Sequence, residues 1–418
     1  MCPKMSASRS FAALVLLLTP LLTASDDSNG DASYQRGRAA FDAGKYTQAI
    51  PPLKAALEKA HATSRTGFTL VQSAYTLALV YQLHGQPTMA EPLYVEAKAA
   101  VEAMGDSGRP LLGFVLESLG ELRFDQGSWN ESEKLQQQAI TICTETHGKN
   151  HICTLTAQRH LGELMIERGS FADAESVFED LIRTLRQMPA PPAEFLASSL
   201  ASFATLQISE ARFETAEPLL RESMDLLSSN RISGPILADT LIDLGRLYRL
   251  EHNCARGEPL LKKALDIYEN GNDPHQAGAL NELGLLALDE QKFAVAKQYL
   301  NRSLDVYQKI AGSTRLLAGR VKAALAEAFL GERNVEQART LIHDALTIER
   351  EALGDQHSEY ARQLIVAANV EASCHRTADA ETYYRQALTI FRRSFSEDQP
   401  ERIGAERKYA QFVQSVRK

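Results

Sequence analysis

Small and apolar residues recur along this chain every 39 to 42 residues, and residues 161–178 show the pattern most clearly. The stretch has the spacing of two short antiparallel helices joined by a tight turn. Gly162 and Ala174 are small enough to let two amphipathic helices cross closely, and Phe178 fills the space beside the crossing. Gly169 supplies the positive φ that such a turn usually requires. Because one hairpin cannot bury its second apolar side, the pattern predicts a stack of hairpins.

The copies can be followed from the small residue that Ala174 represents in the second helix of each hairpin. Ala, Ser or Gly occupies this position in every copy: Ala49, Ala90, Ser132, Ala174, Ala216, Gly257, Ala296, Ala338 and Ala380. Twelve residues upstream, in the first helix, only Gly or Ala is found: Gly37, Ala78, Gly120, Gly162, Ala204, Gly245, Gly284, Ala326 and Ala368. We therefore predict a close helix crossing in each copy.

Three of these stretches, LGELMIERGSFADAESVF, LGLLALDEQKFAVAKQYL and LGRLYRLEHNCARGEPLL, resemble the tetratricopeptide repeat. The period here is longer than the usual ~34 residues of that repeat. Longer loops between hairpins are similar to the kinesin-light-chain type of array, whose linkers carry a Gly-x-x-His motif. Two linkers keep the motif, at Gly148–His151 and Gly354–His357. The resemblance implies an all-α fold, a right-handed α-α superhelix of about nine helical hairpins.

The repeats assign nearly the whole chain. We expect hairpins at 34–67, 71–104, 113–146, 155–188, 197–230, 238–271, 277–310, 319–352 and 361–394. Residues 395–418 should form a capping helix over the last apolar face, because Ile403, Tyr409, Phe412 and Val416 recur there at helical spacing. No uncovered stretch is long enough for a separate catalytic domain.

Residues 1–25 have the pattern of a secretory signal peptide. Lys4 and Arg9 precede a 12-residue apolar core, Phe11–Leu22, which small residues follow. The core is shorter than the ~20 residues of a membrane span. We expect export with cleavage, to the periplasm or outside the cell in a bacterial envelope setting, and no stable membrane span afterwards. Residues 26–33 should form a short disordered lead.

Candidate chemistry is sparse. The net charge of −8 disfavours nonspecific binding of nucleic acid, which depends on phosphate neutralisation. Cys143, His147, His151 and Cys153 are zinc-ligand types, but their spacing is not that of a familiar zinc site. A disulfide between Cys143 and Cys153 and two unpaired thiols remain open. No nucleophile–base arrangement or phosphate loop is visible. We expect no metal, no cofactor and no enzymatic activity.

The expected functional surface is the concave groove lined by one side of each first helix. Repeats 3 and 4 place carboxylates there, which suggests an extended or helical peptide with some basic character. The expected groove residues are Glu117, Glu121, Phe124, Asp125, Arg159, His160, Glu163, Glu167, Arg246 and Asn281. A solvated helix face without a partner would give a similar scatter of charge.

Two functional classes agree with these observations. The first is a noncatalytic scaffold or adaptor that binds a peptide or protein partner in the groove. The second is a structural assembly subunit that self-associates or caps an envelope complex. A groove-based or metal-dependent enzyme is a remote third reading, since repeat arrays serve many functions.

Overall fold

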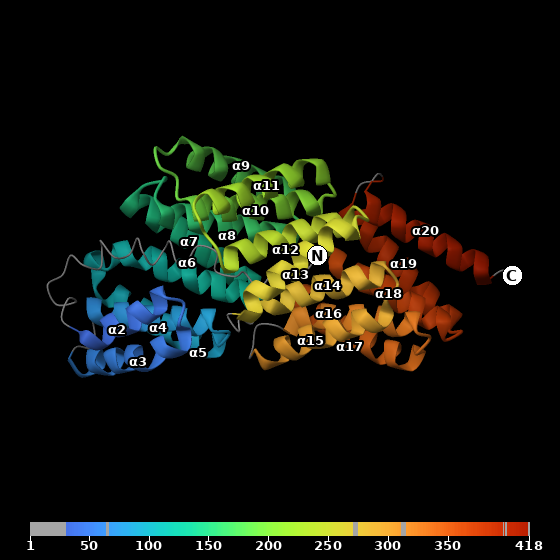
Figure 1. The fold of residues 1–418 in the computed structure, drawn as a ribbon, viewed down its shortest axis with the longest axis horizontal. Helices are drawn as coiled ribbons and strands as arrows, with labels where there is room; N and C mark the ends of the chain where they lie inside the picture. The colour runs from blue at the N-terminus through green and yellow to red at the C-terminus, as the bar shows by residue number, and fades with distance from the viewer. Residues whose placement is uncertain are drawn as a thin grey trace.

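The computed structural model describes residues 31–63, 67–270, 275–310, 315–395, 397 and 399–416. Over these residues the chain forms α-helices, one short 3-10 helix and turns, without a β-strand. The helices wind into an elongated superhelix with α2 near one end of its long axis and α20 at the other (Figure 1). The predicted all-α superhelix is confirmed. The predicted signal peptide, 1–25, and residues 26–30 of the predicted lead lie outside the described residues.

The helices pair into the nine predicted hairpins. They are α2 (Ala32–Asp42) with α3 (Tyr46–Thr63), α4 (Phe68–Leu83) with α5 (Pro87–Ala103), α6 (Arg109–Asp125) with α7 (Trp129–His147), α8 (Ile152–Arg168) with α9 (Phe171–Gln187), α10 (Ala193–Ser209) with α11 (Phe213–Ser229), α12 (Pro235–Leu250) with α13 (Cys254–Asn270), α14 (Gln276–Asp289) with α15 (Phe293–Lys309), α16 (Arg315–Gly331) with α17 (Val335–Leu353), and α18 (Ser358–Ser373) with α19 (Thr377–Ser394). The 3-10 helix η2 (Gly105–Ser107) precedes α6, and α20 (Pro400–Val416) closes the array.

The first helix begins earlier than predicted. The Asp31 side chain accepts hydrogen bonds from the backbone N–H groups of Ser33, at 2.8 Å, and Tyr34, at 3.4 Å. An aspartate in this position satisfies N–H groups that have no partner within the helix. Helix α2 therefore starts at Ala32, and the end of the predicted disordered lead, residues 31–33, belongs to the helix and its cap.

The close crossings lie where the small residues predict them. All the predicted crossing residues are buried, in the first helices and in the second. A Cβ atom added to Gly162 would come within 2.9 Å of Phe178 Cζ, and one added to Gly284 within 2.6 Å of Leu300 Cγ. Such contacts are shorter than van der Waals packing allows, so a larger residue would push the two helices of the hairpin apart.

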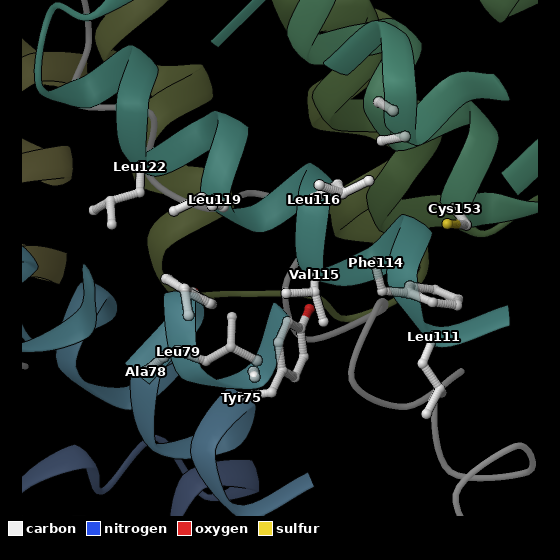
Figure 2. Packing of buried hydrophobic residues seen from close by; sticks show 14 of the residues in the cluster. Tyr75, Ala78, Leu79, Leu111, Phe114, Val115, Leu116, Leu119, Leu122 and Cys153 are labelled. Carbon is white, nitrogen blue, oxygen red and sulfur yellow. The ribbon is translucent and has the colours of Figure 1, made fainter. Parts of the chain in front are cut away.

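Neighbouring hairpins share a continuous apolar core. Figure 2 shows Tyr75, Ala78 and Leu79 of α4 packed beside the apolar side chains of α6, from Leu111 to Leu122. This cluster of buried side chains extends from Tyr34 to Leu206, through the first five repeats. At the other end α20 buries Ala405 and Phe412 against the last repeat, where the rings of Phe412 and Tyr384 lie 5.2 Å apart. Among the described helices, none is both long and apolar enough to cross a membrane.

The two linkers with the Gly-x-x-His motif have the same local structure. Gly148 and Gly354 have positive φ values of 94° and 81°. The histidine that follows caps the next helix, because Nδ1 of His151 accepts from Cys153 N and Nδ1 of His357 accepts from Glu359 N. Across the first of these linkers, Cys143 of α7 and Cys153 of α8 form a disulfide with their Cα atoms 5.8 Å apart.

One superhelical turn brings distant repeats into contact. Because Nδ1 of His357 is an acceptor, Nε2 carries the proton and donates to the backbone carbonyl of Glu167, 2.8 Å away. Trp129 lies beside the same imidazole, with the ring centres 6.1 Å apart. Phe171 packs against the apolar core of the last two repeats. The superhelix is therefore closed on itself between repeats 3 and 4 and repeats 8 and 9.

Candidate functional site

The inner face of the superhelix is formed by the first helices of the repeats, and its N-terminal part is filled by a buried polar network. Glu117 and Glu121 lie one turn apart on α6, so both point toward His160 on the next inner helix, α8. Oε1 of Glu117 lies 2.7 Å from Nδ1 of His160, and Oε1 of Glu121 lies 3.6 Å from Nε2. All three side chains are buried.

Arg159 carries this network toward repeat 5. Its side chain is fully buried, and Nη1 donates to Oε1 of Glu163 at 2.5 Å. The same oxygen accepts from Ser202 Oγ on α10, at 2.6 Å. Nη2 of Arg159 lies 2.6 Å from Nε2 of His160. Burial and Arg159 lower the pKa of His160, but Glu121 and Glu117 outweigh them and raise it above its ordinary value.

Tyrosines extend the network toward repeat 2. The Tyr94 hydroxyl donates to Oε1 of Gln82 at 2.7 Å, and Nε2 of Gln82 lies 3.4 Å from Oε2 of Glu121. Tyr75 and Ser118 share a hydrogen bond of 2.9 Å beside Glu117. Many polar groups on the inner face of repeats 2 to 5 thus bind one another, which offsets part of the cost of burying them.

Glu117, Glu121 and His160 are also the types of residue that hold a metal ion. Their ligand atoms all lie within 4.8 Å of one another. The guanidinium of Arg159, however, lies against Nε2 of His160 and already supplies positive charge to the cluster. A metal cation would be repelled by that group in the observed arrangement. We therefore interpret the cluster as an internal ion-pair network.

The C-terminal part of the inner face is hollow. A cavity of about 460 Å³ lies between the inner helices α10, α12, α14, α16 and α18 and the capping helix α20. Its wall combines apolar side chains such as Leu285, Ile365 and Phe391 with small ones such as Ala324 and Gly404. Cavities of this size, mainly apolar with a few charged groups, are typical of sites that bind ligands.

The charged groups of the cavity wall are mostly basic: Arg246, Arg249, Arg320, Arg362 and Lys408, with Glu327, Glu359 and Glu401. Several of the arginines have acidic partners. Arg246 Nε lies 3.3 Å from Glu282, Arg249 Nη1 lies 2.9 Å from Asp289, and Arg362 Nη2 lies 3.2 Å from Glu401. Enclosure within the superhelix raises the pKa of Glu327, although Lys408 opposes the shift.

The residues predicted for the groove lie on the inner helices but divide between these two regions. Arg246 and Asn281 line the cavity. Glu117, Glu121, Arg159, His160 and Glu163 belong to the buried network, and Phe124 and Asp125 are half-buried at the end of α6. Glu167 lies at the end of α8, against Arg320. These findings do not support the expected preference for a basic peptide. The carboxylates of Glu117, Glu121 and Glu163 are bound to other side chains of the protein, and the charged groups of the cavity wall are mostly basic.

The sequence interpretation missed Arg320, Arg362 and Lys408. The repeat pattern could have identified Arg320 and Arg362. They occupy the same position in repeats 8 and 9, 18 residues before Ala338 and Ala380. The residues predicted for the groove ended with Asn281 in repeat 7. Lys408 lies on the capping helix α20, which is not part of a repeat, so comparison between repeats could not identify it.

Comparison with known families identifies the repeat. Models of the tetratricopeptide repeat match residues 112–187 and 361–401. The chain is similar to Protein KINESIN LIGHT CHAIN-RELATED 1 of Arabidopsis thaliana, 22% identical over 320 residues that cover 74% of this chain and 51% of that protein. A second Arabidopsis protein, KINESIN LIGHT CHAIN-RELATED 3, is 24% identical over 292 residues, 66% of this chain and 43% of that protein. The chain thus spans about half the length of these relatives.

Solved structures share the fold. The structure of a Rap protein complexed with Competence and Sporulation Factor superimposes with a TM-score of 0.61 and 13% identity, over 84% of this chain and 94% of that one. A signal transduction ATPase with a tetratricopeptide repeat sensor, from Pyrococcus horikoshii, gives a TM-score of 0.50 and 12% identity, over 82% of this chain and 54% of that one. At such identities the likeness establishes the architecture alone.

Proposed function

Because this chain is an array of tetratricopeptide repeats, we propose that it is a noncatalytic scaffold that holds a short extended segment of a protein partner in the C-terminal cavity. The observation that carries the proposal is the cavity itself. It lies on the inner face of repeats 5 to 9, whereas the equivalent face of repeats 2 to 5 is occupied by its own side chains.

The composition of the wall suits a peptide. Leu285, Ile365 and Phe391 offer apolar contacts, while the amide of Gln363 can exchange hydrogen bonds with a peptide main chain. The volume of about 460 Å³ accommodates a segment of a few residues. Enclosure by several helices would let such a short segment bury most of its surface, which favours affinity despite its small size.

A bulky residue at Gly404 tests this proposal. Gly404 lines the cavity, and a Cβ atom added there meets no other atom within 4 Å, so a side chain can grow into the space without displacing the fold. Gly404→Phe should abolish binding of an N-acetylated tetrapeptide library to the full chain, measured by affinity selection and calorimetry of the selected peptides. The matched control is Gly278→Phe, because Gly278 is also helical and open but lies outside the cavity wall.

The outcomes separate clearly. Selected peptides that bind wild type and Gly278→Phe equally, and lose binding to Gly404→Phe, would support the cavity as the binding site. Equal binding to Gly404→Phe would place the peptide elsewhere on the superhelix. A library with no binding member would contradict the proposal as a whole.

We also propose that the protein is exported, periplasmic or secreted, after removal of residues 1–25. The support is the charged start and 12-residue apolar core of this segment. Mass spectrometry of the mature N-terminus in the native host tests it. A start near Ser25 or Asp26 is expected, and a chain that still begins at Met1 or Met5 would refute cleavage.

A further inference from the structure

Arg320 differs from the other arginines of the cavity. It lies on α16 with only 6% of its surface exposed. None of its three guanidinium nitrogens meets hydrogen-bond geometry with a described residue. The carboxylate of Glu167 lies 3.8 Å from Nη2, an ion-pair contact beyond hydrogen-bonding distance. A buried guanidinium without hydrogen bonds carries a substantial desolvation penalty, which a ligand that supplies acceptors would remove.

The neighbouring carboxylates do not meet this need. Burial raises the pKa of Glu167, and burial raises the pKa of Glu349 to about 7. Glu349 therefore carries less than full negative charge near neutral pH, and Glu167 lies beyond hydrogen-bonding distance of Arg320. Glu359 accepts a hydrogen bond from Arg362, and Arg320 acts on it only through electrostatic attraction, which together with Arg362 lowers its pKa. Arg320 thus remains a buried cation whose hydrogen-bond donors face a cavity lined by Ala323, Ala324 and Val366.

We propose that Arg320 is the anchor for a carboxylate group of the bound peptide. A carboxylate can accept two parallel hydrogen bonds from one guanidinium, and the low dielectric of an apolar cavity strengthens them. The α-carboxylate of a C-terminal residue and the side chain of Asp or Glu share this chemistry. The inference rests on the proposed function, because it names the ligand group that the cavity selects.

The experiment compares three sets of N-acetylated tetrapeptides on the full chain. The first set has a free α-carboxylate and no acidic side chain, the second an α-amide with one Asp or Glu, and the third an α-amide and no acid. Selection should enrich the first or the second set, which identifies the source of the carboxylate. Amidation of the carboxylate in the best binder should weaken its Kd by about 10- to 100-fold.

Variants of Arg320 complete the test. Arg320→Gln should remove the preference for carboxylates by a similar factor, and Arg320→Lys should keep part of it, because lysine preserves the charge without the bidentate geometry. The matched control is Arg302→Gln, since Arg302 is an exposed arginine of α15 that pairs with Glu269 on the outer surface. Thermal unfolding of each variant shows that the fold is retained.

The two proposals fail in different ways. Peptides of the third set that bind as well as their acidic counterparts, equally to wild type and Arg320→Gln, would overturn the anchor and leave the cavity as the site. Binding by none of the three sets would overturn both.

Discussion

Both regions of the inner face are built from the first helices of the repeats, but their polar side chains differ in what they contact. In repeats 2 to 5, Glu117, Arg159, His160 and Glu163 bind one another across the inner face. In repeats 5 to 9, the inner helices surround a cavity, and Arg320 has no hydrogen bond to a residue that the structure describes. A repeat array can thus use its inner face either as core or as a site, depending on whether the polar residues of successive repeats complement each other.

The turns within the hairpins also differ between the N-terminal and the C-terminal repeats. In repeats 1 to 4 the left-handed residue of each turn is a glycine, at Gly44, Gly85, Gly127 and Gly169, and φ lies between 69° and 78°. In repeats 5 to 9 it is Ala211, His252, Gln291, Arg333 and His375, and φ lies between 57° and 63°. A side chain in this conformation costs about 1–2 kcal/mol relative to glycine. The C-terminal half therefore has more strain in its turns.

Of the substitutions considered, removal of the Arg159 guanidinium should have the largest effect on stability. Arg159→Ala removes a fully buried guanidinium and leaves the half-buried carboxylate of Glu163 without its ion pair. We expect the free energy of unfolding to fall by about 3–5 kcal/mol, the usual cost of breaking a buried pair. Urea denaturation followed by circular dichroism measures it.

The matched change in the other half is Arg320→Ala, which removes a buried arginine that has no hydrogen bonds to described residues. Its cost should be less than half that of Arg159→Ala. Equal losses would show that the two regions do not differ in the way proposed.

Glu349 should make the C-terminal half sensitive to pH. The side chain is fully buried, neither oxygen meets hydrogen-bond geometry with a described residue, and burial raises its pKa from 4.5 to about 7. Between these values the folded state keeps a proton that the unfolded chain has lost. Stability from this group is therefore complete below about pH 4.5 and is lost as pH rises toward 7.

The variant Glu349→Gln should remove this dependence. Relative to it, the free energy of unfolding of the wild type should fall by on the order of 2–3 kcal/mol between pH 5 and 7. Urea denaturation at several pH values gives the difference curve. Parallel curves for the two proteins would contradict the assigned pKa.

Overpacking of a crossing tests the feature that the two halves share. Ala174→Leu inserts three carbon atoms where the helices of repeat 4 meet, and should cost about 1–3 kcal/mol. Ala172→Leu is the control, because Ala172 lies on the same helix and is exposed. A denaturation midpoint that is unchanged by the first substitution would mean that the crossing tolerates bulk.

Exchange of the left-handed turn residues should have the smallest effect on stability. Gln291→Gly should stabilise the protein by about 0.5–1 kcal/mol, since relief of the left-handed strain exceeds the entropy cost of glycine. Gly127→Gln should destabilise it by a similar amount. The two shifts in urea midpoint should have opposite signs, and shifts of the same sign would contradict the assignment of strain to these turns.

The architecture could be predicted from the sequence because each close helix crossing depends on the size of residues within a single hairpin. Gly162 faces Phe178 within one hairpin, so spacing and residue size alone identify the contact. The network was not predictable in this way, because His160 and Glu117 come from different repeats and meet only after the hairpins stack. The surroundings of Arg320 depend on contacts of still longer range, since its ion-pair partner Glu167 belongs to repeat 4 and Arg320 to repeat 8.

The contact between His357 and the carbonyl of Glu167 fixes the number of hairpins between these two residues. An open solenoid can gain or lose a unit between its caps, because each unit meets only its neighbours. Here the imidazole must return to one particular carbonyl after a set number of hairpins. Duplication or deletion of a repeat between them would carry the two groups out of register, so evolution of this array by whole-repeat steps is restricted to the region outside the closed turn.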